Sequence, residues 1–168
     1  MFKNYKKKFF FSFLIIIVIF ACDRISKLYI LNLAEAEEHI DIYYNSLLNF
    51  HLIWNKGIAF GLFSLEASFY YNLITILIIL INIIILAMII RSQDYKILFL
   101  LMILGGSFGN LFDRLYYKAV PDFIDLHYKE FHWFIFNVAD IFITLGVICL
   151  ILIELLNKNK EKVLNENK

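Results

Sequence analysis

The chain has 168 residues, of which 61% are hydrophobic, with a formal net charge of +1 and a mean hydropathy of +0.72. Soluble globular domains are closer to half apolar, so this composition indicates a membrane protein and argues against a soluble domain. The length suits one domain, and the sequence carries no basic patch of the kind that binds nucleic acid.

Four apolar segments are long enough to cross a hydrocarbon core, which takes about 20 residues of helix. We therefore expect an all-α membrane protein with four transmembrane helices in a single domain covering residues 1–168. The predicted spans and connections are residues 9–30, 69–90, 97–117 and 133–156, an outer loop at 31–68 and a tail at 157–168.

Lysine and arginine residues gather on one side of these spans. Four lysines precede the first span, Arg91 and Lys96 lie in the hairpin between the second and third, and four more lysines lie in the tail. Because short loops rich in Lys and Arg stay in the cytoplasm, both termini are predicted to be cytoplasmic. The acidic loop at 31–68 then faces outward.

Residues 1–22 have features of a cleavable targeting signal, with a lysine-rich start, a long apolar run and a cysteine at position 22. However, Phe20 is bulky for a cleavage site, and the helical pattern continues through residues 24–30. We therefore expect this segment to be retained as the first span.

The loop between the first two spans shows a period-two pattern. Apolar residues alternate in HIDIYYN at 39–45 and in LNFHLIWN at 48–55, which predicts a small extracytoplasmic β-sheet. Asn55 and Gly57 then provide turn chemistry. The next segment, GLFSLEASF at 61–69, is predicted to form a short interfacial helix.

Polar residues occur inside three of the four predicted spans. At about 1.5 Å of rise per residue, Asp23, Asn110 and Asp140 each lie about 20 Å from the cytoplasmic edge. Asn110 shares a helical face with Arg114, and Asn137 shares one with Asp140. An ionisable side chain in mid-span is costly and by default marks a functional site, which singles out Asp140.

Basic residues near the ends of the predicted spans have a simpler interpretation. They can be packed polar residues with satisfied partners, or their apolar stems can lie along the hydrocarbon while their charged ends reach the membrane interface. The four residues to which we assign one of these two roles are Arg24, Lys27, Lys118 and Lys129.

Asp122 lies in a predicted outer loop, but Pro121 stiffens its surroundings. Proline fixes its own φ angle and favours an extended conformation at Val120, so the segment could fold back beside Asp140. Two carboxylates that share a site cannot both ionise comfortably, and the pair then holds one proton. The ionised member can take a proton from water while the protonated member hydrogen-bonds a carbonyl, which would hydrolyse an amide without a metal.

Two other functional classes use carboxylates in membranes. A small proton-coupled transporter would spread titratable groups through the membrane depth, whereas the cytoplasmic halves of these spans are almost purely apolar. A lipid phosphotransferase would use several carboxylates to hold Mg²⁺, and only Asp122 and Asp125 lie close together in sequence. The transporter is the principal alternative at this point.

The histidines give no sign of a metal site in the sequence. They lie at positions 39, 51, 127 and 132, without an H-E-x-x-H motif or any other tight ligand spacing. We therefore predict no metal ion and no other cofactor.

Five short motifs occur in order along most of the chain. They are DRISK at 23–27, NKGIAFGL at 55–62, GGSFGNLFDR at 105–114, VPDFIDL at 120–126 and FNVAD at 136–140. Each motif alone is weak, but their order and spacing resemble those of lipoprotein signal peptidase, the bacterial signal peptidase II. That family consists of aspartic peptidases of the inner membrane with four spans.

This resemblance implies a role for each matching residue. Asp122 and Asp140 would be the catalytic aspartates. The residues that would orient these aspartates and the substrate backbone are Asp23, Asn55, Asn110, Arg114 and Asn137. Gly109 and Asp113 would have supporting structural roles.

The resemblance also implies a substrate and a location. The substrates would be prolipoproteins whose lipobox cysteine carries a diacylglyceryl group, and cleavage before that cysteine would release the signal peptide. The protein would cross the bacterial inner membrane several times, in contact with membrane lipids, with its site on the periplasmic side. One chain could supply the whole site, so we expect a monomer that needs neither metal nor nucleic acid.

Overall fold

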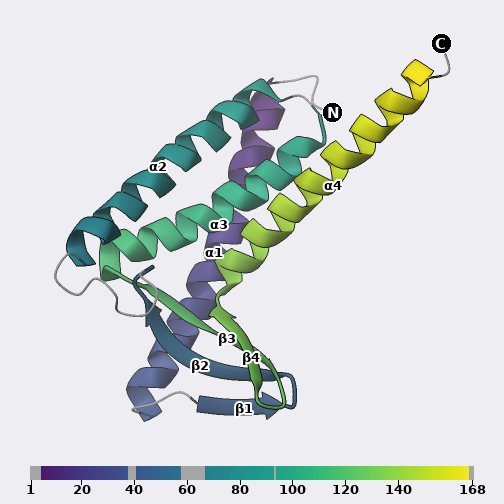
Figure 1. Ribbon diagram of the computed structural model, residues 1–168. Coiled ribbons are helices and arrows are strands. Elements are labelled where there is room, and N and C mark those ends of the chain that lie inside the picture. The colour runs from purple at the N-terminus through teal and green to yellow at the C-terminus, as the bar shows by residue number, and fades with distance from the viewer. Residues whose placement is uncertain (1–4, 38–40, 58–66, 93, 167–168) are drawn as a thin grey trace.

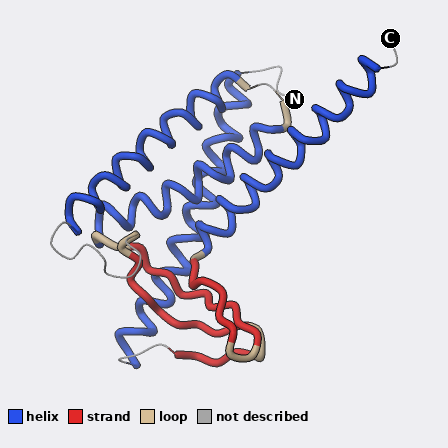
Figure 2. The backbone as a smooth tube through the Cα atoms, in the orientation of Figure 1, coloured by secondary structure: helices blue, strands red, loops and turns tan. Residues whose placement is uncertain are grey.

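The computed structural model describes residues 5–37, 41–57, 67–92 and 94–166. Within these residues the chain forms four helices and one four-stranded antiparallel sheet (Figures 1 and 2). The elements are α1 Tyr5–Glu37, β1 Asp41–Asn45, β2 Leu48–Asn55, α2 Ala67–Arg91, α3 Lys96–Tyr117, β3 Val120–Tyr128, β4 Phe131–Phe136 and α4 Val138–Glu166. The predicted interfacial helix at 61–69 lies largely outside the described residues.

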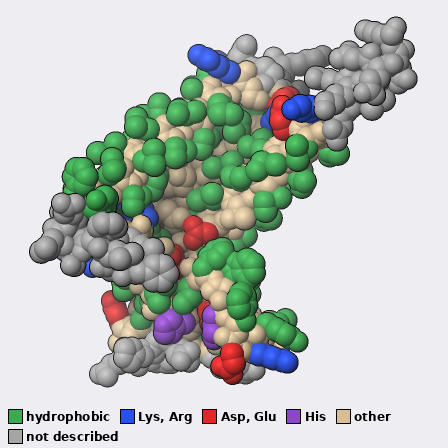
Figure 3. All heavy atoms as spheres, viewed as in Figure 1, with side chains coloured by type: hydrophobic (Ala, Val, Ile, Leu, Met, Phe, Trp, Pro, Cys, Tyr) green, Lys and Arg blue, Asp and Glu red, His purple; other side chains and the backbone are tan. Residues whose placement is uncertain are grey.

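All four helices are long and apolar enough to cross a membrane, which confirms the prediction of four membrane-length helices. Large apolar side chains cover the outside of the helical part, whereas charged and histidine side chains gather towards its two ends (Figure 3). Helix α3 is central and packs against each of the other three helices. Its buried face is lined by Ile97, Leu100, Leu101 and Leu104, which pack with Ile85 and Ile89 of α2.

Glycines on α3 let two neighbouring helices approach its backbone. A Cβ atom at Gly106 would lie 2.5 Å from the carbonyl oxygen of Ala139 in α4, and one at Gly109 would overlap the carboxylate of Asp23 in α1. A side chain at either position would push apart the helices that carry the polar residues of the interior.

Replacing Gly106 by alanine is expected to lower the free energy of unfolding by about 1–3 kcal/mol, because the new methyl group meets backbone rather than a movable side chain. Gly105→Ala is the comparison variant, since the three atoms nearest to its Cβ belong to the side chain of Ile19 and lie 3.0 Å or farther away. Thermal unfolding of both purified variants checks this prediction. Equal losses would show that the α3–α4 contact does not limit stability.

The sheet has the strand order β1-β2-β3-β4 and lies at one end of the helices, opposite both termini (Figure 1). Strands β1 and β2 confirm the sheet predicted between the first two spans. Strands β3 and β4 were not predicted. Asp122 therefore lies in a strand, paired with Ile53 of β2, and not in a loop.

The predicted start of the fourth span at Trp133 is wrong. Residues 131–136 form β4, which pairs with β3, and α4 begins only at Val138. The apolar side chains of FHWFIF belong to a strand that joins the helix directly, so length and hydropathy alone merge the two elements. Earlier in the chain, Lys118 adopts a left-handed conformation with φ 59° at the turn from α3 to β3.

Candidate active site

Asn137 and Asp140 form a capping box at the start of α4. The backbone N–H of Asp140 donates to Oδ1 of Asn137 at 3.1 Å, and the backbone N–H of Asn137 donates to Oδ2 of Asp140 at 3.1 Å. This reciprocal pair satisfies two backbone donors at a helix N-terminus, where the helix dipole also favours a carboxylate. The N-x-x-D spacing of FNVAD is the sequence signal that could have located the helix start.

The same asparagine binds the second carboxylate. Nδ2 of Asn137 donates to Oδ1 of Asp122 at 2.6 Å. Asn137 is fully buried and Asp122 is only 2% exposed. A single residue therefore connects the two carboxylates, since Asn137 donates to Asp122 of β3 from its side chain and to Asp140 of α4 from its backbone N–H.

Each carboxylate also accepts a hydrogen bond from an amide on a different element. Nδ2 of Asn55, at the end of β2, donates to Oδ2 of Asp122 at 2.8 Å. Nδ2 of Asn110, in α3, donates to Oδ1 of Asp140 at 2.8 Å. Neutral amides thus hold both acids in place without supplying a positive charge that would fix them as ions.

A buried ion cluster lies beside this pair and decides between the two roles predicted for Arg24 and Lys27. Lys27 is completely buried and binds the carboxylates of Asp23 and Asp113, while Arg24 binds the same two carboxylates. Both are therefore packed residues with charged partners, not residues that extend to the membrane interface. The two acids and two bases balance in charge, which offsets part of the cost of burying them.

The ion cluster contacts the carboxylate pair at two points. Nζ of Lys27 donates to Oδ1 of Asn110 at 2.9 Å, which turns the amide NH₂ of Asn110 towards Asp140. Asp23 accepts a hydrogen bond from the backbone N–H of Ala139 at 3.1 Å. Lys27 was missed as a site residue, although its four-residue spacing from Asp23 places both on one face of α1.

Arg114, although predicted as a site residue, contacts the turn at Gly57 and the ring of Tyr71. Its guanidinium packs against Gly57, where an added Cβ would lie 2.9 Å from Nη2, and covers the ring of Tyr71. Nη1 is buried and has no hydrogen-bond partner among the described residues. Gly57 has φ 74° and donates its N–H to Oδ1 of Asn55, so Arg114 supports the turn that presents Asn55.

A groove of 560 Å³ opens next to the carboxylate pair. Asp140 lies on its wall, and the remaining lining is mostly apolar and aromatic. Representative lining residues are Leu126, Phe134, Phe136, Ile141 and Leu145. An apolar groove that reaches a few polar groups is the usual form of a binding site for a largely apolar ligand.

Burial raises the pKa of Asp122 to about 6, and the nearby Asp140 carboxylate acts in the same direction. Hydrogen bonds from Asn55 and Asn137 partly oppose this shift in the pKa. Asp122 therefore gives up its proton less readily than an exposed aspartate, as expected for one member of a carboxylate pair.

The raised pKa of Asp122 predicts a specific pH dependence of stability. Between about pH 4 and pH 6 the folded state holds this proton more tightly than the unfolded chain, so stability falls as the pH rises through that window. Relative to Asp122→Asn, the wild type should lose up to about 3 kcal/mol between pH 4 and pH 7. Thermal unfolding of both proteins across this range measures the difference, and parallel curves would contradict the assigned pKa.

Four membrane-length helices, with two carboxylates bound by one asparagine where α4 meets the sheet, define a membrane protein with a candidate aspartic-hydrolase site. The family model of "Signal peptidase (SPase) II" matches residues 15–156. The chain belongs to this family of membrane aspartic peptidases.

Similar proteins agree with this assignment. The lipoprotein signal peptidase of Pelagibacter ubique (strain HTCC1062) is 58% identical over 92% of this chain and 93% of its own length. That of Anaplasma phagocytophilum (strain HZ) is 38% identical over 92% of this chain and 97% of its own. A bacterial membrane enzyme solved by the in meso method at 2.3 Å resolution is 28% identical, with a TM-score of 0.68 over 90% of each chain.

Proposed function

We propose that Asp122 and Asp140 are the catalytic pair with which this signal peptidase II removes signal peptides from prolipoproteins. The observation that carries the proposal is the shared asparagine, since Asn137 binds both carboxylates at the edge of an apolar groove. Two acids held this close by neutral donors can share one proton.

The chemistry follows from that shared proton. The ionised carboxylate takes a proton from a water molecule as the water oxygen attacks the scissile carbonyl carbon, and the protonated carboxyl group donates its proton to the carbonyl oxygen. The resulting diol collapses when the first carboxyl group protonates the amide nitrogen. The C–N bond then breaks, the second carboxylate recovers a proton from the diol, and the pair returns to its starting state.

Three asparagines keep this pair aligned. The side chains of Asn55 and Asn137 hold Asp122, while the side chain of Asn110 and the backbone N–H of Asn137 hold Asp140, so neither carboxylate needs to reorganise during the reaction. Asp23 acts one step further away, by binding the N-terminal turn of α4 through Ala139. Arg114, whose guanidinium packs against Gly57, would position the Asn55 turn for the substrate backbone.

The groove beside Asp140 suits the apolar parts of a lipidated substrate. Its aromatic and aliphatic lining would accept the diacylglyceryl group or the neighbouring signal-peptide residues while the scissile bond lies over the carboxylates. This arrangement explains how a membrane enzyme could select a bond next to a lipid-modified cysteine.

The proposed orientation places both termini in the cytoplasm and the sheet on the outer side of the bacterial inner membrane. Lysines concentrate near the termini, at the end of the helices opposite the sheet (Figure 1). The catalytic pair, at the junction between helices and sheet, would then lie towards the periplasmic surface. One chain supplies both carboxylates and the asparagines that bind them, so the proposed enzyme needs no second copy to complete its site.

A cleavage assay tests this function. The full-length protein in detergent is incubated with a lipobox peptide that carries diacylglyceryl on its cysteine, alongside the same peptide without lipid, and products are identified by mass spectrometry. We expect cleavage immediately before the modified cysteine, continuing in the presence of a chelator. Equal cleavage of the unmodified peptide would refute the lipid requirement, and loss of cleavage with chelator would refute a metal-free pair.

A further inference from the structure

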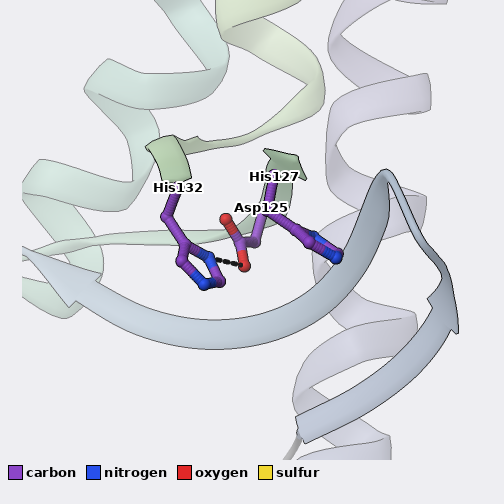
Figure 4. Close-up of side chains that lie close together, drawn as sticks. All are labelled: Asp125, His127 and His132. Carbon is purple, nitrogen blue, oxygen red and sulfur yellow. Dashed lines mark hydrogen bonds and ion pairs between the residues drawn. The ribbon is translucent and has the colours of Figure 1, made fainter. Parts of the chain in front are cut away.

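A second cluster of reactive side chains lies on the hairpin formed by β3 and β4. Asp125, His127 and His132 each offer one ligand atom, and these atoms all lie within 4.8 Å of one another. The three side chains converge, and Asp125 contacts the ring of His132 (Figure 4). We propose that these residues bind a divalent transition-metal ion, independently of the catalytic pair.

The positions become neighbours only through strand pairing. His127 pairs directly with His132 across the hairpin, and the register shifts between Asp125 and His127. The linear spacing of the three residues has no metal-binding signature, which is why the sequence predicted no metal site. Their imidazole rings are stacked, with centroids 5.2 Å apart.

Asp125 supplies an independent indication that this cluster can bind a cation. The residue is only 4% exposed, and although its Oδ2 lies 2.8 Å from Nδ1 of His132, its Oδ1 is buried with no hydrogen-bond partner among the described residues. Leaving a buried carboxylate oxygen without a partner is costly. A bound cation would satisfy this oxygen.

The neighbouring strand β2 contributes a second buried oxygen atom without a hydrogen-bond partner among the described residues. Asn49 of β2 pairs directly with Asp125, so both side chains lie on the same face of the sheet. Oδ1 of Asn49 is also buried and has no partner in the part of the chain that the structure describes. Two unsatisfied acceptor oxygens beside two imidazoles form a ligand set for a cation, with Asn49 available as a fourth ligand.

The geometry requires only a small adjustment to close around an ion. Two ligand atoms bound to one zinc ion at about 2.1 Å lie about 3.4 Å apart in a tetrahedral site. The side chain of His132 is 54% exposed, so it can rotate by the small amount needed. Exposure also leaves room for a water molecule in the coordination shell.

The donor types indicate which ions fit. Two imidazole nitrogens and a carboxylate oxygen favour Zn²⁺, Cu²⁺ or Ni²⁺ over Mg²⁺ and Ca²⁺, which prefer oxygen ligands alone. Bound metal would tie β3 to β4, and the same hairpin forms a wall of the groove that reaches Asp140. Metal binding should therefore stiffen this wall without taking part in the hydrolysis.

The test uses full-length protein, purified without a polyhistidine tag and treated with chelator. Isothermal titration with ZnCl₂ should show one ion per chain, and thermal unfolding should shift to higher temperature with Zn²⁺ but not with Mg²⁺. Co²⁺ used as a probe should give visible absorption bands typical of a nitrogen and oxygen site. Absence of zinc binding by the wild-type protein would overturn the proposal.

Variants show whether these residues hold the ion. His132→Gln, at an exposed position, should weaken zinc binding at least tenfold and abolish the thermal shift. His51→Gln is the matched control, since His51 is an exposed histidine of β2 outside the cluster. Asp125→Asn gives a second readout, through loss of the Co²⁺ bands. Unchanged zinc binding by both His132→Gln and Asp125→Asn would place the ion elsewhere and overturn the assignment.

Discussion

Replacing Asp122 or Asp140 by asparagine lowers kcat on a diacylglyceryl lipobox peptide by about 1000-fold or more. Each substitution keeps the size of the side chain but removes a group that must gain and lose a proton, and general acid–base catalysis of this kind is worth about 100- to 10,000-fold. Because the two acids act as one unit, the double variant should lose little more than either single variant. Initial-rate measurements with each purified protein check this prediction.

A matched control separates this loss from a general effect of removing a negative charge. Asp94→Asn makes the same chemical change in the exposed hairpin between α2 and α3, far from the site, and should keep nearly full activity. Thermal unfolding identifies any variant that is inactive because it is misfolded. If a folded Asp122→Asn or Asp140→Asn protein cleaved within tenfold of the wild-type rate, that aspartate would not be catalytic.

The second large effect is expected at Lys27. Lys27→Met should lower the free energy of unfolding by about 3–5 kcal/mol, since it leaves Asp23 and Asp113 buried with only Arg24 to balance them. It also removes the donor that orients Asn110 towards Asp140. Denaturant-induced unfolding in mixed micelles measures the loss.

Two further variants test whether the loss at Lys27 comes from the buried ion pairs. Lys7→Met alters an exposed lysine of the same helix and should change stability by less than about 0.5 kcal/mol. Combining Lys27→Met with Asp113→Asn removes one charge of each sign, so the double variant should be more stable than the sum of the two single losses predicts. Similar small losses for Lys27→Met and Lys7→Met would show that the buried cluster contributes little to the fold.

The helical part of the fold could be predicted from the sequence because its signal is strong and local. An apolar run of about 20 residues has few other uses, and the four helices follow such runs. The sheet was only half predicted, since β3 and β4 lack an alternating pattern. Burial covers almost every residue from Val120 to Asp125, and FHWFIF continues into the apolar start of α4.

Sequence analysis found the site residues whose charge is costly to place in an apolar segment. It missed the residues whose role depends on which partners the fold brings to them. Asp140 stands out in the sequence because an apolar segment that begins at Trp133 would place its carboxylate inside a span, whereas the structure places it in the first turn of α4. Lys27 does not, since a lysine near a predicted helix end is usually solvated, and only the folded structure places it between Asp23 and Asp113. His127 and His132 likewise become a pair only through the strand register.

The most direct measurement of the central claim is a crystal structure of the protein with a lipidated lipobox peptide whose scissile amide is replaced by a secondary-alcohol isostere. That hydroxyl group mimics one oxygen of the diol formed during hydrolysis. We predict that it binds between Asp122 and Asp140, at about 3 Å from an oxygen of each carboxylate, with the lipid in the groove beside Asp140. A hydroxyl group that contacts neither aspartate, or only one of them, would contradict the proposed catalytic pair.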